Sequence, residues 1–196
     1  MPDNTGFVDR YAHGEIPWDS GQPSKELVRL LDAGKLPGQT VLEIGCGTGT
    51  NALELARRGR TVTALDYVPQ AIDAARAKAR QAKLTVDFRV ADVLQADLSG
   101  PYDILFDRGV YHHLRQENLP GFQQFLERVT RSGSRWLSLA GNAKEKHDPG
   151  PPVVSESELR AELEPLFQIV ELREFRFTSG QNGFQPLAWS ILLQRR

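Results

Sequence analysis

A glycine-rich segment directly after a short apolar run constrains the fold of this chain more than any other feature. Residues 40–51 read TVLEIGCGTGTN, in which aliphatic residues lead into glycines at positions 45, 47 and 49. The apolar run predicts a buried β-strand. The glycines predict a loop whose backbone approaches a ligand closely, because glycine lacks a Cβ and accepts positive φ. A helix after the loop would direct its free backbone amides at that ligand.

The spacing of the glycines indicates which kind of ligand the loop accepts. A dinucleotide-binding turn has the pattern G-x-G-x-x-G, which places its third glycine at position 50, where this chain has Thr50. The chain instead reads G-x-G-x-G, with Glu43 two residues before the first glycine. A carboxylate there disfavours a pyrophosphate and favours a cationic ligand. A nicotinamide-dependent oxidoreductase on a similar sheet is therefore the weaker interpretation.

The segment EIGCGTGTN resembles the glycine motif of class I S-adenosylmethionine (SAM)-dependent methyltransferases. In that family the loop surrounds the amino-acid end of the cofactor, and S-adenosylhomocysteine (SAH) is the product. The resemblance implies that the cofactor contacts Glu43, Gly45, Cys46, Gly47, Gly49 and Asn51. Glu43 could alternatively organise the loop by accepting backbone amides. Cys46 is expected to be a small loop residue, since a sulfonium donor needs no covalent enzyme intermediate.

Strand and helix patterns alternate along most of the chain, which predicts an α/β protein. Strands are expected at 40–44, 61–66, 85–90, 102–107, 135–140, 168–177 and 187–194, and helices at 24–33, 51–58, 69–83, around 122–129 and from a Ser155–Glu158 capping box. The last two strands follow each other without a helix and could pair antiparallel. We therefore predict a doubly wound, mostly parallel seven-stranded sheet, Rossmann-like, with an antiparallel C-terminal strand. The class I methyltransferase fold has the same order, and the resemblance covers residues 24–195.

Acidic residues end three of the first four expected strands: Asp66, Asp92 and Asp107. Ligands of open parallel sheets bind at the carboxyl ends of the strands. Asp66 lies 21 positions after Gly45, where a carboxylate in such folds accepts both ribose hydroxyls. It could also cap the next helix, and the two roles are compatible. The family resemblance places Tyr67 and Val68 against the adenine, with Val93 beneath the ring, and implies that Asp92 accepts from the exocyclic amine of the adenine. Asp92 could instead be a solvated turn residue, and Asp97 is the nearby competitor for its role.

The fourth strand ends in FDRGVYHHL, residues 106–114. Its Asp-Arg-Gly resembles the thiopurine methyltransferase-like branch, and its His-His-Leu resembles a segment of many small-molecule methyltransferases. We expect catalytic residues among Asp107, His112 and His113, substrate contacts from Arg108, Tyr111 and His112, and a cofactor contact from Asp107. His112 is the first choice as general base, since a histidine with a pKa near 6.5 could accept a proton from a thiol, phenol or amine. Arg108 could instead pair with Asp107, and either histidine could simply pack or cap a helix. No metal is expected, because no further ligand stands at metal spacing.

The N-terminal segment YAHGEIPWDSGQP, residues 11–23, resembles the P-W-D-x-G-x-P start of thiopurine, tellurite and halide methyltransferase-like proteins. There this segment covers the cofactor, with its tryptophan against the methionine end. We therefore expect residues 1–23 to form a lid, residues 24–196 to form the methyltransferase domain, and Tyr11 and Trp18 to line the acceptor site. An indole face attracts a sulfonium, and a lid excludes water. The alternative is an arm whose Trp18 only covers apolar surface.

The composition of the chain limits which kinds of partner we expect it to bind. The formal net charge is -1, there is one cysteine, and no long apolar run is present. We expect a cytoplasmic monomer or weak homodimer with no nucleic-acid or membrane partner. The expected function is methyl transfer from SAM to a small-molecule acceptor, with a soft one (thiol, chalcogen or halide) favoured by the resemblance. Alternatives are an O- or N-methyltransferase of a small metabolite and a non-catalytic SAM-binding regulatory module.

Overall fold

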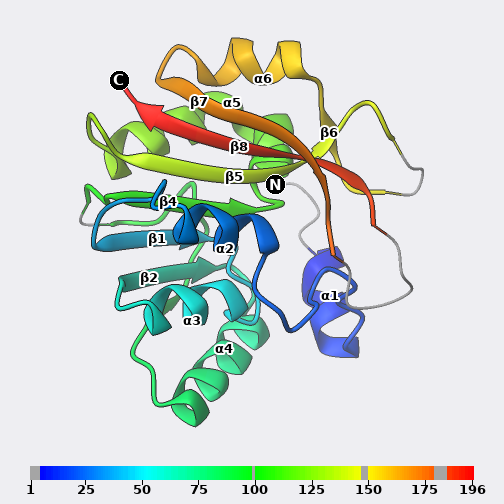
Figure 1. The fold of residues 1–196 in the computed structure, drawn as a ribbon. Helices are drawn as coiled ribbons and strands as arrows, with labels where there is room; N and C mark the ends of the chain where they lie inside the picture. Colours follow the sequence, from blue (N-terminus) through cyan, green and yellow to red (C-terminus); the bar gives the residue numbers. More distant parts are fainter. Residues whose placement is uncertain (1–4, 99, 147–149, 179–184) are drawn as a thin grey trace.

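The computed structural model describes residues 5–98, 100–146, 150–178 and 185–196 (Figure 1). Its helices are α1 (Thr5–His13), α2 (Lys25–Asp32), α3 (Thr50–Arg57), α4 (Pro69–Ala82), α5 (Tyr111–Val129) and α6 (Glu156–Leu163). Its strands are β1 (Thr40–Ile44), β2 (Thr61–Asp66), β3 (Asp87–Val90), β4 (Ile104–Arg108), β5 (Arg135–Asn142), β6 (Val153–Val154), β7 (Phe167–Arg176) and β8 (Leu187–Arg195). Among the described residues, no helix is both long enough and apolar enough to cross a bilayer.

The strands form one sheet in the order β3-β2-β1-β4-β5-β8-β7, and the two-residue strand β6 pairs with β5. The strands from β1 to β5 pair in parallel, whereas β8 runs antiparallel to both β5 and β7. Only residues 177–186 connect β7 to β8, and this connection is shorter than the roughly 12 or more residues that a parallel crossover needs. The predicted doubly wound sheet and its antiparallel C-terminal addition are confirmed, with β6 as an additional short strand.

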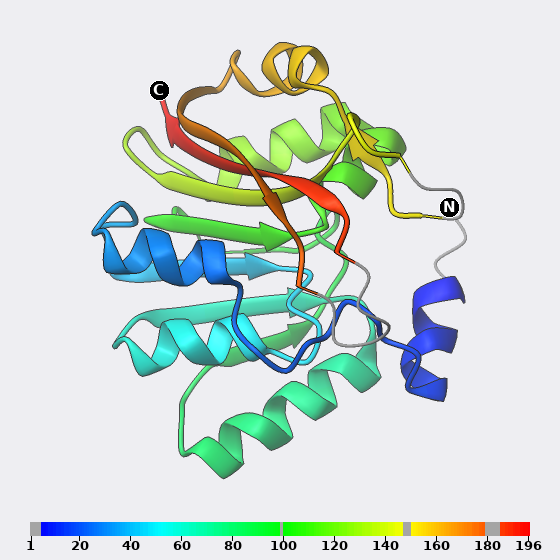
Figure 2. The same ribbon diagram turned by 45° about the vertical axis from the view of Figure 1, so that its right-hand side comes forward.

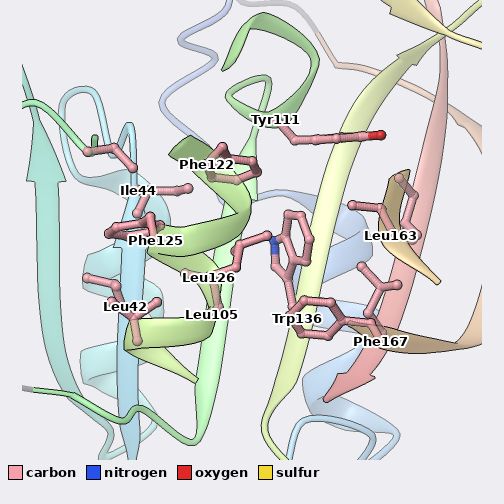
Figure 3. Packing of buried hydrophobic residues seen from close by; sticks show 14 of the residues in the cluster. Leu42, Ile44, Leu105, Tyr111, Phe122, Phe125, Leu126, Trp136, Leu163 and Phe167 are labelled. Carbon is pink, nitrogen blue, oxygen red and sulfur yellow. The ribbon is translucent and has the colours of Figure 1, made fainter. Parts of the chain in front are cut away.

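Helices cover both faces of the sheet (Figures 1 and 2). Helices α2, α3 and α4 pack on one face through aliphatic residues such as Leu30, Leu53 and Ile72. Helices α5 and α6 cover the other face, where the core is aromatic (Figure 3). Trp136 of β5 is fully buried there, with its ring centroid 5.8 Å from that of Phe122. The core holds the carboxyl ends of the parallel strands in a fixed arrangement.

Local chemistry explains where several helices begin and bend. The expected capping box is confirmed, since Ser155 and Glu158 exchange side-chain and backbone hydrogen bonds at the start of α6. Helix α5 is interrupted at Asn118, which has non-helical φ and ψ of -157° and 73°, and Pro120 follows. Proline cannot donate within a helix. The Asn118 side chain instead caps the second half by accepting from the Gly121 amide at 3.0 Å.

Some expectations need correction. Ser24 precedes α2, but its side chain makes no capping hydrogen bond; its backbone amide donates instead to Asn51 Oδ1 at 2.8 Å. Strand β3 starts at residue 87 rather than 85, and helix α1 was not expected. Strand β5 continues to residue 142 rather than ending at 140, and residues 153–154 form the additional strand β6.

The carboxyl ends of β1, β2 and β4 lie at one edge of the sheet, and α1 lies beyond them (Figure 2). The chain from α1 to α2 passes over this edge before the first strand begins. The sheet therefore brings the glycine segment, the strand-end acids and the N-terminal segment to one region.

Candidate functional site

Two glycines of the loop after β1 are required for different steric reasons. Gly49 has a φ of 78°, and a Cβ there would lie 2.8 Å from the side chains of Ala75 and Phe88, so this glycine lets the start of α3 pack closely on α4 and β3. Gly47 has a φ of 55°, and a Cβ there would lie 2.8 Å from the Tyr11 hydroxyl. Gly47 therefore lets the N-terminal segment approach the backbone of the loop closely, which a side chain at this position would prevent.

Glu43 lies directly beneath this loop and is almost fully buried. Burial raises its pKa to about 8, although Asn51 and the Ala52 amide oppose the shift by hydrogen bonding. Its Oε2 atom has no hydrogen-bond partner. A buried acceptor without a partner is costly. A nearby cation would favour its ionised form, which fits the ammonium group at the amino-acid end of the expected cofactor.

Asp66 joins the end of β2 to the glycine loop. Its Oδ2 accepts from the Gly47 amide at 2.8 Å and its Oδ1 accepts from the Val68 amide at 3.0 Å. Burial raises its pKa, and these amides oppose the shift. Asp66 thus organises the loop and the start of α4. Each carboxylate oxygen has further lone pairs, so these contacts leave room for ribose hydroxyls.

Asp92 follows β3, where it caps a turn by accepting from the Leu94 amide at 2.9 Å and from Gln95 Nε2 at 2.9 Å. Val93 and Val68 are buried, and the hydroxyl of the half-buried Tyr67 has no partner. These residues lie where the sequence predicted them, after β2 and β3, and their roles toward adenine stay predictions.

Cys46 is a buried free cysteine within the loop. Burial raises the pKa of its thiol well above the usual range. A neutral buried thiol is a poor nucleophile, which agrees with the expectation of a small loop residue.

An aromatic cluster covers the loop edge and is made by Phe7, Tyr11, Trp18, Tyr67 and His113. Trp18 Nε1 donates to the Tyr11 hydroxyl at 3.3 Å, and the Phe7 ring centroid lies 5.3 Å from that of Trp18. Burial raises the pKa of Tyr11, which is therefore a neutral phenol. The structure thus brings the predicted Tyr11 and Trp18 together above the glycine loop.

Phe7 is a member of this cluster that the sequence analysis missed. Its ring contacts Tyr67 and His113 at centroid distances of 6.3 and 5.5 Å. The available signal was its spacing of four residues from Tyr11, which places both rings on one face of a helix.

The two adjacent histidines differ in environment. His112 is almost fully buried, and its Nδ1 accepts from the Gly141 amide at 2.8 Å, which places the ring proton on Nε2, toward the Gly109 backbone. Burial lowers its pKa to about 3. With Nδ1 already accepting and Nε2 protonated, His112 has no free basic nitrogen, which disfavours it as a general base.

His113 is partly buried and belongs to the aromatic cluster. Burial lowers its pKa below the usual 6.5, so its imidazole is neutral at pH 7. Within the described part of the chain its ring makes no hydrogen bond. Of the two histidines, only His113 therefore has a ring nitrogen available to accept a proton.

Asp107 is fully buried, and its carboxylate is fully engaged in the fold. Its Oδ1 accepts from the amides of Val110 and Tyr111 at 3.1 and 3.0 Å, and its Oδ2 accepts from Trp136 Nε1 at 2.9 Å. Asp107 therefore links the start of α5 to β5 and presents no free oxygen. This environment corrects the expectation of a catalytic or cofactor contact, because a carboxylate with no exposed atom cannot touch either ligand.

Tyr111 and Arg108 also differ from expectation. Tyr111 is fully buried, and its hydroxyl donates to Glu162 at 2.7 Å, so it belongs to the core rather than to the substrate site. Arg108 does not pair with Asp107; it donates to the backbone carbonyls of Trp18 and Thr178. Among the described residues, no group of three His, Cys, Asp or Glu side chains could hold a metal ion.

Comparison with known proteins agrees with this geometry. Residues 41–133 match a family model described as a methyltransferase domain. The chain is 34% identical over 174 residues to a 2-heptyl-1-hydroxyquinolin-4(1H)-one methyltransferase of Mycobacteroides abscessus, covering 86% of this chain and 76% of the relative. It is 27% identical over 187 residues to a probable thiol methyltransferase 2 of Arabidopsis thaliana, covering 93% of this chain and 82% of the relative.

A solved structure from work on the conversion of a disulfide bond into a thioacetal group during echinomycin biosynthesis has a TM-score of 0.80 to this chain. The two are 29% identical, and the match covers 91% of this chain and 84% of the other. The similarity thus includes the N-terminal half, where the glycine loop lies, and extends over most of the sheet.

Proposed function

The chain belongs to the class I SAM-dependent methyltransferases, and we propose that its acceptor is a small, flat molecule with an acidic S–H group. It is an enzyme that transfers methyl groups to small molecules. When bound, SAM supplies a methyl group on a positively charged sulfur, ready for in-line attack. The residues of this chain must hold the two reactants, exclude water and remove the acceptor proton.

The cofactor-holding residues follow from the loop geometry. We propose that the backbone at Gly45 and Gly47 approaches the amino-acid end, that Glu43 supplies a negative charge beneath it, and that Asp66 accepts the ribose hydroxyls. Three observations support this fit: the positive φ of Gly47, the partnerless Oε2 of Glu43, and the position of Asp66 between loop and α4. Asp92, Val93, Tyr67 and Val68 are proposed to surround the adenine.

The neutral, unengaged imidazole of His113 is the observation that carries the proposal about the acceptor. A base whose pKa lies below 6.5 is a weak base. It can assist an acceptor with a pKa near that of a thiol, about 8.5, but not an aliphatic alcohol, which resembles water at about 15.7. We therefore propose that His113 Nδ1 or Nε2 accepts the proton of an acidic acceptor.

The aromatic cluster supports a flat and soft acceptor. The Phe7 ring contacts the rings of Trp18, Tyr67 and His113. A planar acceptor beside His113 would make ring–ring contacts of the same kind. Desolvation in such surroundings increases the reactivity of a polarisable thiolate toward the methyl group. We propose that residues 1–23 act as the lid that creates this environment.

A second candidate is an acidic hydroxyl on a heteroaromatic ring. The name of the Mycobacteroides abscessus relative specifies a 1-hydroxyquinolin-4(1H)-one, which is flat and carries such a hydroxyl. His113 could accept the proton of this hydroxyl as well. The Arabidopsis relative, by its name, acts on thiols, which favours the first candidate.

A matched acceptor panel tests the proposal. Wild-type enzyme is incubated with SAM and quinoline-4-thiol, 1-hydroxyquinolin-4(1H)-one, an aliphatic alcohol or iodide, and methylated product and SAH are measured. We expect the thiol to have the highest kcat/KM, the hydroxyquinolone to follow, and the alcohol to be inert. Faster transfer to the hydroxyquinolone would establish the second candidate, and transfer to iodide alone would refute the need for a base.

Paired histidine variants test the base. His113→Gln should lower kcat for the thiol about 10²-fold, the lower end for a general base, and the loss should shrink at high pH, where the thiol ionises without help. The iodide rate, if measurable, should change little, since iodide has no proton to lose. His112→Gln is the matched control: we expect it to lower thermal stability more than His113→Gln does. A pH-independent loss in His113→Gln would contradict the role.

A further inference from the structure

Arg108 connects two segments that are far apart in the sequence. It ends β4, and its Nη1 donates to the carbonyl oxygen of Trp18 at 2.9 Å while its Nη2 donates to that of Thr178 at 3.0 Å. Its guanidinium carbon lies 4.8 Å from the ring centroid of Phe177. The side chain therefore joins the N-terminal segment, the central strand β4 and the chain just beyond β7.

The buried Arg108 guanidinium is stabilised by hydrogen bonds to backbone carbonyls. Burial lowers the pKa of Arg108, and the charge of Asp19 opposes this shift. Within the described residues no carboxylate forms an ion pair with Arg108. A desolvated cation without a paired anion is costly unless hydrogen bonds compensate. The planar guanidinium can direct separate N–H groups at two carbonyls, which a single ammonium group cannot do with the same rigidity.

The residue after Trp18 is tied to the cofactor loop by a second set of contacts. Asp19 Oδ2 accepts from the Thr48 hydroxyl at 2.5 Å, and Lys78 Nζ lies 3.8 Å from the same oxygen. Lys78 also donates to the Thr48 hydroxyl at 2.5 Å. The N-terminal segment is thus attached to β4 at residue 18 and to the glycine loop at residue 19.

We propose that Arg108 is a positioning residue that makes the segment around Trp18 and the segment ending at Thr178 into one wall of the acceptor site. The proposal rests on the proposed function in one respect, namely that this wall encloses the acceptor. Arg108 then acts through the backbone of both segments rather than through contact with the acceptor. Its loss frees both segments together, while the contacts of Asp19 with the glycine loop keep the cofactor in place.

Hydrogen–deuterium exchange on the full chain saturated with SAH tests this coupling without any acceptor. Arg108→Met keeps the apolar contact with Phe177 but removes both donors. We expect exchange to rise about tenfold in peptides covering residues 16–20 and also in peptides covering 175–178. Arg108→Lys should restore protection in one of the two segments at most. Arg10→Met is the matched control, because the Arg10 guanidinium carbon lies 5.7 Å from the Trp18 ring centroid but, among the described residues, does not contact the segment 175–178. This variant should leave exchange in residues 175–178 unchanged.

A kinetic measurement adds a readout that a purely structural role would not change. With quinoline-4-thiol as the acceptor, Arg108→Met should raise KM for the thiol at least tenfold while the Kd of SAH changes less than twofold. Exchange that rises in only one segment, or in neither, overturns the proposal, as does equal protection in the Met and Lys variants. If Arg108→Met fails to fold, the Lys variant decides: raised exchange in at least one of the two segments supports the proposal, and wild-type protection in both overturns it.

The failure of this proposal differs from a failure of the proposed function. If the thiol is no substrate but both segments lose protection together, the coupling stands and the acceptor assignment falls. If the thiol is a substrate and the segments respond independently, the acceptor assignment stands and the coupling falls.

Discussion

Replacing Glu43 by glutamine should remove most of a pH dependence that the buried carboxyl imposes on stability. In the folded protein the pKa of Glu43 is about 8, against an ordinary value of 4.5. Between these two values the folded state holds a proton that the unfolded state has lost. The free energy of unfolding therefore falls as the pH rises through this window. Glutamine has a similar shape and no proton to lose, so the variant lacks this contribution.

The magnitude follows from the shift. Each pH unit within the window costs about 1.4 kcal/mol, so three units between pH 5 and pH 8 cost about 4 kcal/mol. This is a large fraction of a typical stability of 5–15 kcal/mol. The other buried acids, Asp66 and Asp107, are present in both proteins, and their contributions cancel to first order in the comparison.

Urea unfolding at pH 5, 6, 7 and 8 gives the two profiles. We expect the stability difference, variant minus wild type, to grow by about 4 kcal/mol from pH 5 to pH 8. A pH-independent cost of placing the glutamine amide in this site is the same at pH 5 and pH 8, so it does not affect the expected growth of the difference. Parallel profiles, within about 1 kcal/mol over the range, would show that Glu43 is ionised in the folded protein and would refute the reasoning.

Three further changes test other parts of the site. Asp66→Ala should weaken SAH binding by roughly 1 to 3 kcal/mol through the loss of hydrogen bonds to a charged acceptor, and unchanged affinity in calorimetry would remove Asp66 from the cofactor site. Asp107→Asn should lower the free energy of unfolding by about 2 to 4 kcal/mol, because an amide N–H would face the Trp136 N–H, yet the folded fraction should stay active; an inactive variant of normal stability would argue instead for a role in chemistry. Gly47→Ala should weaken SAH binding and disturb the Tyr11 contact, whereas Gly133→Ala, at a φ of 87° with open space around it, should cost only the ~1 to 2 kcal/mol of backbone strain, so equal SAH affinity in both would contradict a ligand-facing loop.

Much of the fold could be predicted because local patterns and long-range packing agree in this chain. The alternation of apolar strands and amphipathic helices predicted the parallel order, and two strands without an intervening helix predicted the reversal at β8. Helix α1 was missed because its residues are mostly polar and its few aromatics pack onto other segments. The bend at Asn118 depends on a side chain that caps the helix after an interruption, which periodicity alone does not reveal.

The positions of the site residues could be predicted from the sequence, whereas the roles of several of them could not. Glycine spacing and strand-end acids carry information in their positions, since the carboxyl ends of parallel strands converge at one edge. The roles of Asp107 and of the two histidines depend instead on what surrounds each side chain. The Asp107 carboxylate accepts hydrogen bonds from Val110, Tyr111 and Trp136. An acidic residue at the end of a strand does not by itself predict any of these donors.

The sequence by itself determined the class of fold, because hydrophobic periodicity is a local property, and the cofactor, through the family resemblance of its glycine segment. Only the tertiary structure distinguishes the environments of His112 and His113, since burial and hydrogen bonding from Gly141 depend on a strand almost thirty residues away. It likewise decided that Arg108 holds two backbone carbonyls rather than Asp107. The ionisation and hydrogen bonding of a side chain depend on its neighbours in space. The order of residues along the chain does not show which residues those neighbours are.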